Sequence, residues 1–73
     1  MALPLKQRKQ IGEAVRKYRT AAGMTQALLA EKADLHPVYV SRVECGAETV
    51  SVHALVRISK ALGKRVRDLV EEI

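Results

Sequence analysis

The sequence predicts an all-α fold, a compact five-helix bundle in which two short helices are joined by a tight turn. Apolar residues recur at helical spacing through nearly the whole chain, and turn-forming residues interrupt them at short intervals. The valine-rich stretches 38–43 and 50–52 have some strand propensity, but their breaks and their spacing favour helix. With 73 residues the chain is long enough for one domain, residues 1–73, and too short for a second.

The first helix is predicted from one apolar face. Its members are spaced at helical intervals: Ile11, Val15, Tyr18 and Ala22. Pro4 suits a position at or before the first turn, because its missing N–H has no helical partner there. Gly23 suits the left-handed conformation that ends many helices, so we expect the helix to stop just before it.

A second, shorter helix is predicted over residues 25–33. Thr25 is a preferred N-cap residue. The residues expected to face inward are Leu29, Ala30 and Ala33. Asp34 breaks the pattern, and aspartate tolerates the left-handed conformation better than most residues other than glycine. We therefore expect a tight turn through Asp34 and Leu35.

The third helix is expected to begin at Pro37 and to end at Gly46. His36 then falls at the N-cap, where histidine is not a preferred residue. Val40 and Val43 have the spacing of inward-facing residues.

Two further helices are predicted in the C-terminal part of the chain. Ser51 caps the fourth helix and Gly63 ends it. The apolar residues of this helix are Val52, Leu55, Ile58 and Leu62. The last segment also has apolar residues at helical spacing, namely Val66, Leu69, Val70 and Ile73.

The charge balance points to an anionic partner. The chain has 13 Lys and Arg against 8 Asp and Glu, a net charge of +5 and a pI of about 9.8. Such a balance is most often found in proteins that bind nucleic acid. The excess lies toward the N-terminus, because residues 6–19 hold six basic side chains and one acidic one.

Several kinds of site are excluded by composition. The single cysteine, Cys45, allows neither an intrachain disulfide nor a thiolate zinc site, and an unreactive thiol is favoured over a redox switch. His36 and His53 have no carboxylate or cysteine arranged around them, so we expect no metal. Nothing assembles a nucleophile, a base and an oxyanion site, so we expect no cofactor and no enzyme.

The chain is expected to be cytoplasmic. One cysteine fits a reducing compartment. No apolar run approaches the roughly 18 residues that a membrane span needs, and the N-terminal residues lack the apolar stretch of a signal peptide.

Two short predicted helices joined by a tight turn, the second polar on one side, suggest a helix-turn-helix unit at about residues 25–45. The segment TQALLAEKADLHPVYVSRVECG, residues 25–46, resembles the signature of the Xre/Cro-type helix-turn-helix family. The matching residues are Ile11-Gly12, Arg19, Gly23, Thr25-Gln26, Leu29-Ala30, Val40, Val43, Glu44, Gly46, Ser51, Leu55 and Ala61-Leu62-Gly63. The resemblance covers about residues 8–70 and implies a lambda-repressor-like DNA-binding domain.

Within this family a shorter run is similar to the small controller proteins of restriction–modification systems. It consists of Leu35, His36, Tyr39 and Ser41. Such controllers are stand-alone domains of about this length that dimerise and regulate transcription. They often carry a basic and a small polar residue where this chain has Pro37 and Val38, so controller-type base contacts are not carried over to these two positions.

Base contacts are expected from the third helix. The second helix of a helix-turn-helix enters the major groove, and its first residues meet base edges. Val38, Ser41 and Arg42 share a face, and the Arg42 fork can bond guanine O6 and N7. Val38 suits a thymine methyl, Ser41 a base or a phosphate, and Tyr39 a base or the backbone. The alternatives are a plain surface charge for Arg42, core or dimer packing for Tyr39 and incidental exposure for Val38.

Phosphate contacts are expected from Gln26, Lys9, Arg16 and Pro37. The family resemblance places Gln26 on a phosphate, where the helix N-terminus adds backbone donors. A solvated surface amide is the alternative. The basic residues near the N-terminus suit the phosphate backbone, and a solvated charged face is an equal alternative for them.

The same resemblance pairs Arg19 with Glu44. An arginine late in the first helix and a glutamate at the end of the third would form an ion pair that is at least partly buried. We expect this pair to orient the third helix and not to touch DNA.

Dimerisation is expected because one recognition helix contacts too few base pairs to be specific. Two such helices about 34 Å apart on a two-fold axis read a palindrome. We expect a dimerisation helix at about residues 65–73, with Leu69 closing the core and Val66, Val70 and Ile73 at the interface. The alternative is that all four close the core of one subunit.

The sequence therefore predicts a homodimeric, sequence-specific regulator of transcription that binds double-stranded DNA at a palindromic operator. A restriction–modification controller or a phage-type repressor is the expected setting, and RNA polymerase is a candidate partner. The alternative is the antitoxin of a toxin–antitoxin pair, which would hold a protein partner. RNA binding is disfavoured, because Tyr18 and Tyr39 are the only aromatic side chains on which bases could stack.

Overall fold

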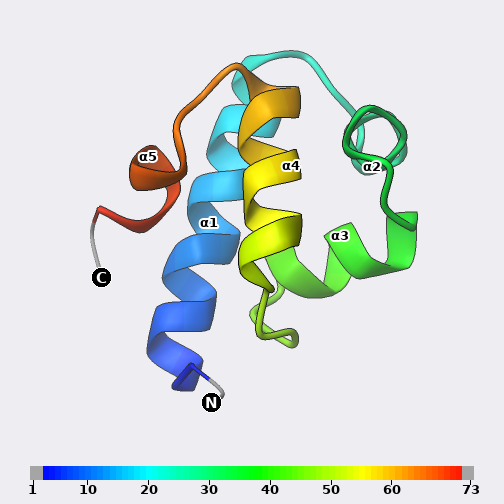
Figure 1. Ribbon diagram of the computed structural model, residues 1–73. Coiled ribbons are helices and arrows are strands. Elements are labelled where there is room, and N and C mark those ends of the chain that lie inside the picture. The colour runs from blue at the N-terminus through cyan, green and yellow to red at the C-terminus, as the bar shows by residue number, and fades with distance from the viewer. Residues whose placement is uncertain (1–2, 72–73) are drawn as a thin grey trace.

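Residues 3–71, the part of the chain that the computed structural model describes, form five helices and no strand (Figure 1). The helices are α1 (Leu5–Ala21), α2 (Gln26–Ala33), α3 (Pro37–Glu44), α4 (Val52–Leu62) and α5 (Val66–Val70). The all-α fold predicted from the sequence is confirmed. No helix within these residues is long and apolar enough to span a membrane.

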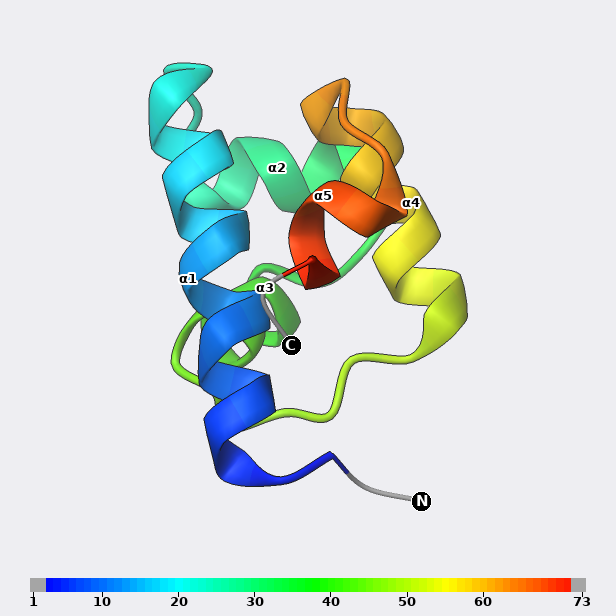
Figure 2. The same cartoon turned by 90° about the vertical axis from the view of Figure 1, so that its left-hand side faces the viewer.

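Helices α2, α3 and α5 pack around α1 and α4. Figure 2 shows α1 and α4 on either side of the view, with α5 between them on the near side and α2 and α3 behind. Helix α2 packs chiefly on α4 and α3, while α3 packs on α1 and α2. This arrangement leaves α3 and α5 at different surfaces of the molecule.

One hydrophobic core joins all five helices. Its members are Ile11, Val15, Leu29, Ala30, Ala33, Val40, Val43, Leu55, Ile58, Leu62 and Leu69. The inward-facing residues predicted for the second and third helices are all among them, and so is Leu69. Two residues that the sequence placed on the apolar faces of helices lie outside the core. Ala22 is the exposed C-cap of α1, and Val52, the first residue of α4, is 77% exposed.

The helix ends follow local side-chain chemistry. The Oγ1 of Thr25 accepts a hydrogen bond from the Leu28 N–H at 3.0 Å, and the Oγ of Ser51 accepts one from the Ala54 N–H at 3.1 Å. Asp34 ends α2 in the left-handed conformation, with φ of 56°. The short turn between α2 and α3 therefore begins at Asp34, as the sequence predicted.

The N-cap of α3 is effective although histidine is not a preferred cap. The Nδ1 atom of His36 accepts a hydrogen bond from the Val38 N–H at 3.1 Å. Pro37 occupies the first helical position, where it removes one N–H that would otherwise need a partner. An imidazole nitrogen thus replaces the usual hydroxyl or carboxylate oxygen at the start of this helix.

Helix α1 touches the end of α3 through Gly12. A Cβ atom at this position would clash with the Val43 carbonyl oxygen and would lie 2.7 Å from the Glu44 carbonyl oxygen. Only glycine therefore lets the two helices approach this closely. The contact places the C-terminal end of α3 directly on the surface of α1.

The C-terminal helix is shorter than predicted. Helix α5 ends at Val70, whereas the sequence predicted a helix over about residues 65–73. Ile73, expected at a dimer interface, lies outside the described residues.

Candidate nucleic-acid interface

Helix α3 has one buried face and one face open to solvent. Val40, Val43 and Glu44 are buried against α1 and α2. On the opposite side, Val38 is 58% exposed and the Arg42 side chain is 53% exposed. The residues that the sequence predicted to meet base edges therefore include two at the open face.

A buried ion pair holds the end of α3 to α1. Arg19 donates from Nε to Glu44 Oε2 at 2.6 Å and from Nη2 to Glu44 Oε1 at 3.0 Å. The two side chains are only 11% and 3% exposed. A fork-to-carboxylate pair with two parallel bonds has a defined orientation as well as a high strength. The structure thus contains the pair that the family resemblance implied.

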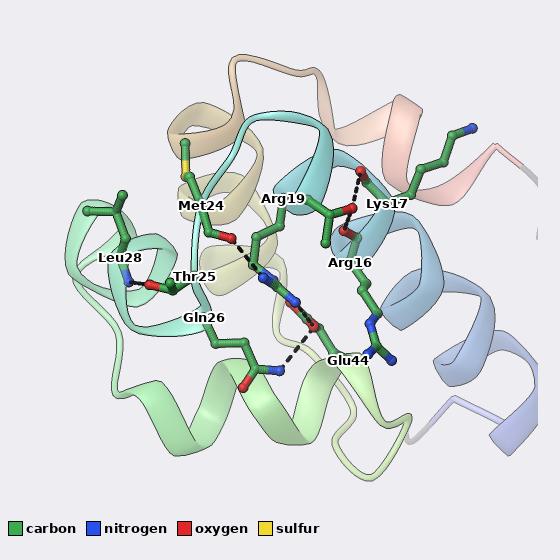
Figure 3. Close-up of polar contacts among 9 residues, drawn as sticks. Arg16, Lys17, Arg19, Met24, Thr25, Gln26, Leu28 and Glu44 are labelled. Atoms are coloured by element: carbon green, nitrogen blue, oxygen red, sulfur yellow. Dashed lines mark hydrogen bonds and ion pairs between the residues drawn. The ribbon is translucent and has the colours of Figure 1, made fainter.

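Two further contacts extend this pair into a network over three helices (Figure 3). Arg19 donates from Nη1 to the Met24 carbonyl oxygen at 2.8 Å, in the link between α1 and α2. Gln26, the first residue of α2, donates from Nε2 to Glu44 Oε1 at 3.1 Å. Because Glu44 belongs to α3, the network joins the start of α2 and the end of α3 to α1.

The electrostatics of the network keep Arg19 charged. Hydrogen bonding to Glu44 raises the pKa of Arg19 above its already high ordinary value, burial lowers it by less, and the negative charge of Glu44 adds a smaller increase. The carboxylate of Glu44 accepts hydrogen bonds from two neighbouring donors, the Arg19 cation and the neutral Gln26 amide. Its role is structural, because it faces the interior and not the open side of α3.

Gln26 has a hydrogen-bond partner that the sequence did not reveal, the Glu44 carboxylate. One of its two amide hydrogens goes to Glu44, so one is left for another acceptor. The first N–H groups of a helix have no intrahelical partner, and Thr25 caps that of Leu28. The amide of Gln26 is thus held beside the backbone donors at the start of α2.

Arg42 does not project freely from α3. Its Nε donates to Glu48 Oε1 at 3.3 Å, and its Nη2 donates to the Ala47 carbonyl oxygen at 3.3 Å. Both partners lie in the turn that follows the helix. Glu48 was not among the residues predicted from the sequence, where its only signal is an acidic residue six positions after Arg42 and two after Gly46.

Tyr39 has the core packing that was the alternative to a base contact. It is half-buried against the core, and its hydroxyl oxygen accepts a hydrogen bond from the Ser51 N–H at 3.3 Å. This contact joins α3 to the start of α4. The hydroxyl hydrogen is still able to donate, so the residue has both a packing position and one donor at the edge of the open face.

The residues expected to contact phosphate are spread over three helices. Lys9 and Arg16 are exposed on α1, and in Figure 3 the Arg16 side chain extends toward the end of α3 while Lys17 extends the opposite way. Pro37 is exposed at the start of α3 but has no N–H to donate, and the next N–H is taken by His36. Pro37 can therefore offer only van der Waals contact.

The residues expected at a dimer interface lie on another surface. Val66 and Val70 are half-buried on α5 and pack partly against the core. Helix α5 contacts α1 and α4, on the side of the molecule away from α2 and α3 (Figure 2). The open face of α3 is thus separate from the surface that α5 presents.

Known proteins are similar to this chain in sequence and in fold. A family model described as helix-turn-helix matches residues 15–69. Control protein C.BamHI of Bacillus amyloliquefaciens is 41% identical over 61 residues, which make up 82% of this chain and 75% of that protein.

Two solved structures show the same arrangement of helices. The restriction-modification controller protein C.AhdI from Aeromonas hydrophila is 34% identical, with a TM-score of 0.83 over 85% of this chain and 94% of that chain. The clp gene regulator ClgR from Corynebacterium glutamicum is 35% identical, with a TM-score of 0.85 over 99% of this chain and 74% of that chain. The chain therefore belongs to the Xre/Cro-type helix-turn-helix family, whose signature lies on α2 and α3.

Proposed function

We propose that this protein is a sequence-specific regulator of transcription that binds double-stranded DNA through α3. The observation that carries the proposal is the combination of an open α3 face with a buried network that orients the helix. Val38 and Arg42 are exposed, while Arg19, Gln26 and Glu44 hold the other side of α3 to the bundle. A helix held in this way can enter the major groove with its side chains already in position.

Each residue predicted to meet base edges has a chemical role in this proposal. Arg42 reads guanine, because a guanidinium fork matches the O6 and N7 acceptors. Val38 contacts a thymine methyl, Ser41 bonds a base or a phosphate, and Tyr39 donates its hydroxyl hydrogen at the edge of the face. These contacts involve binding and no covalent chemistry.

Phosphate contacts set the register of the protein on the duplex. Gln26 donates its second amide hydrogen together with the backbone N–H groups at the start of α2. Lys9 and Arg16 supply exposed positive charge from α1, and Pro37 packs against the backbone. Together with the net charge of +5, these residues give the affinity its dependence on salt.

The proposed active form is a homodimer. A palindromic operator requires two recognition helices about 34 Å apart on a two-fold axis. Val66 and Val70 are half-buried in one subunit, and contact with a second copy would complete their burial. Because α5 lies away from α3, such contact leaves both recognition helices accessible.

The relatives favour one setting over the others. Control protein C.BamHI and C.AhdI both bear the name of controller proteins, which supports restriction–modification control over a phage-type repressor or an antitoxin. RNA polymerase is a candidate partner in the cytoplasm, where such a regulator meets DNA. Transcription with purified polymerase on a template carrying the operator tests that contact.

Selection of bound sites from random duplex DNA tests the proposed function. We expect a palindromic consensus whose half-sites are centred about one helical turn apart. A consensus without symmetry would contradict the dimer, and a pool that does not converge would contradict sequence-specific binding. Co-purification with a tightly bound protein instead of DNA would favour the antitoxin.

A further inference from the structure

The guanidinium of Arg42 is held by the turn that follows its own helix. Gly46 has φ of +76°, and this conformation turns the chain back so that the Ala47 N–H donates to the Arg42 carbonyl oxygen at 2.9 Å. The Ala47 carbonyl oxygen in turn accepts from Arg42 Nη2. Backbone and side chain of Arg42 are therefore both bonded to the same residue of the turn.

The turn packs closely on α1. A Cβ atom at Gly46 would lie 2.7 Å from Cγ of Lys9, so the turn rests directly on α1. The Glu48 side chain, 34% exposed, follows this turn and accepts from Arg42 Nε at 3.3 Å. The position of its carboxylate is thus linked to the packing of the turn on α1.

The two bonds occupy one edge of the guanidinium and leave another open. Nε and Nη2 form the side edge, which faces Glu48 and Ala47. Nη1 and the second hydrogen of Nη2 form the terminal edge, and the side chain is 53% exposed. Two adjacent N–H groups are what the O6 and N7 acceptors of guanine require. Arg42 can therefore hold Glu48 and guanine at the same time.

We propose that Glu48 is a positioning residue that sets the sequence specificity of the protein by fixing the terminal edge of Arg42 before DNA binds. The inference rests on the proposed function. A long side chain that is already ordered loses less conformational entropy on binding, and the benefit appears only where a base accepts both N–H groups. A carboxylate near the duplex also repels phosphate, so Glu48 lowers affinity for every sequence alike, and only the guanine contact of Arg42 offsets that loss.

The test compares two substitutions that remove the same charge. Glu48→Gln keeps an oxygen that can accept from Nε, whereas Glu48→Ala removes it. Affinities are measured at fixed salt for a duplex carrying the selected consensus and for a shuffled duplex of the same length. We expect Glu48→Ala to lower the ratio of consensus to shuffled affinity roughly three- to tenfold and Glu48→Gln to lower it less. Preference for guanine at one position of each half-site should weaken in parallel.

Controls separate positioning from general charge. Glu31→Ala removes an exposed carboxylate from α2 and should leave the ratio unchanged. In an Arg42→Ala background, Glu48→Ala should have no effect on the ratio, because the residue it positions is absent. Thermal unfolding of each variant shows whether the fold is retained.

Three outcomes would overturn the inference. An unchanged ratio would remove any role in specificity, equal loss for Glu48→Gln and Glu48→Ala would assign the effect to charge alone, and a raised ratio would show that Glu48 sequesters Arg42. Failure of the wild-type chain to select any consensus would instead overturn the proposed function, and the inference with it.

Discussion

Arg19 and Glu44 lie 25 positions apart in the chain and meet in a two-point ion pair, with distances of 2.6 and 3.0 Å between their donor and acceptor atoms. The pair joins the end of the first helix to the end of the helix that we propose enters DNA. Gln26 shares the same carboxylate, so the start of α2 is bound to the same point. Glu44 therefore connects the end of α3 to both α1 and the start of α2.

Arg19→Met should lower the free energy of unfolding by about 3 kcal/mol, because it leaves the Glu44 charge buried without its partner. Arg16→Met is the matched control, since Arg16 is exposed on the same helix. Denaturant unfolding of the two variants measures the difference. Equal midpoints would show that the pair adds nothing to stability. Adding Glu44→Leu to Arg19→Met should recover part of the loss.

The contribution of Arg19 should not depend on pH in the ordinary working range. Glu44 raises the pKa of Arg19 in the folded state, so the stabilisation is complete below the unfolded-state pKa and is lost only as the pH rises through the folded-state value. Both values lie far above neutrality. The difference in unfolding free energy between wild type and the Arg19→Met/Glu44→Leu double variant, which leaves no unpaired buried carboxylate, should therefore be constant from about pH 6 to about pH 9. A fall in this difference toward pH 9 would contradict the assignment.

Gly12→Ala should destabilise the protein by about 1–3 kcal/mol, because the new methyl group would overlap carbonyl oxygens of α3. Glu13→Ala, at the exposed neighbouring position, is the control. Denaturant midpoints compare the two. If Gly12→Ala gained stability, as alanine does in an open helix, the close approach of α1 and α3 would be wrong.

Local chemistry made the helix ends and the core predictable. Thr25, Asp34 and Ser51 act within a few residues of their own position, so their roles follow from residue type alone. The pairing of Arg19 with Glu44 was accessible because both residues belong to a known family signature. The caps join residues that are neighbours in the chain, and the ion pair is part of the family signature, so neither prediction required the three-dimensional fold.

Contacts that depend on the path of the chain were not predictable. The Arg42–Glu48 pair exists because Gly46 turns the chain back along α3, and the same sequence with another turn would separate the two side chains. Val52 follows the apolar spacing of α4 but is exposed, since side chains in the first turn of a helix point toward its N-terminus and past the packed region. The ring of Tyr39 packs against the core while its hydroxyl bonds the start of α4, and this division could not be predicted without the fold.

Arg42→Ala should weaken binding to the selected duplex by about 1–3 kcal/mol and relax the preference at one base pair of each half-site. Lys60→Ala removes the same charge from the last turn of α4, which lies away from α3 in Figures 1 and 2. This control should lower affinity for all duplexes slightly and alter no base preference. Titrations against duplexes substituted at each position distinguish the two effects. An unchanged base preference in Arg42→Ala would remove Arg42 from the reading face.

Val70→Glu should convert the proposed dimer to a monomer, because it places a charge on the α5 surface that a second copy would cover. Sedimentation equilibrium should then give the mass of one chain, 8.1 kDa, in place of twice that value. Val52→Glu is the matched control, since it introduces the same charge at a valine that is 77% exposed on α4, and it should leave the mass of the dimer unchanged. Circular dichroism shows whether each variant keeps its helices, because Val70 also packs partly against the core. A folded Val70→Glu variant that sediments as a dimer would move the interface away from α5, whereas a monomer that binds its half-site weakly and without cooperativity would connect dimerisation directly to operator recognition.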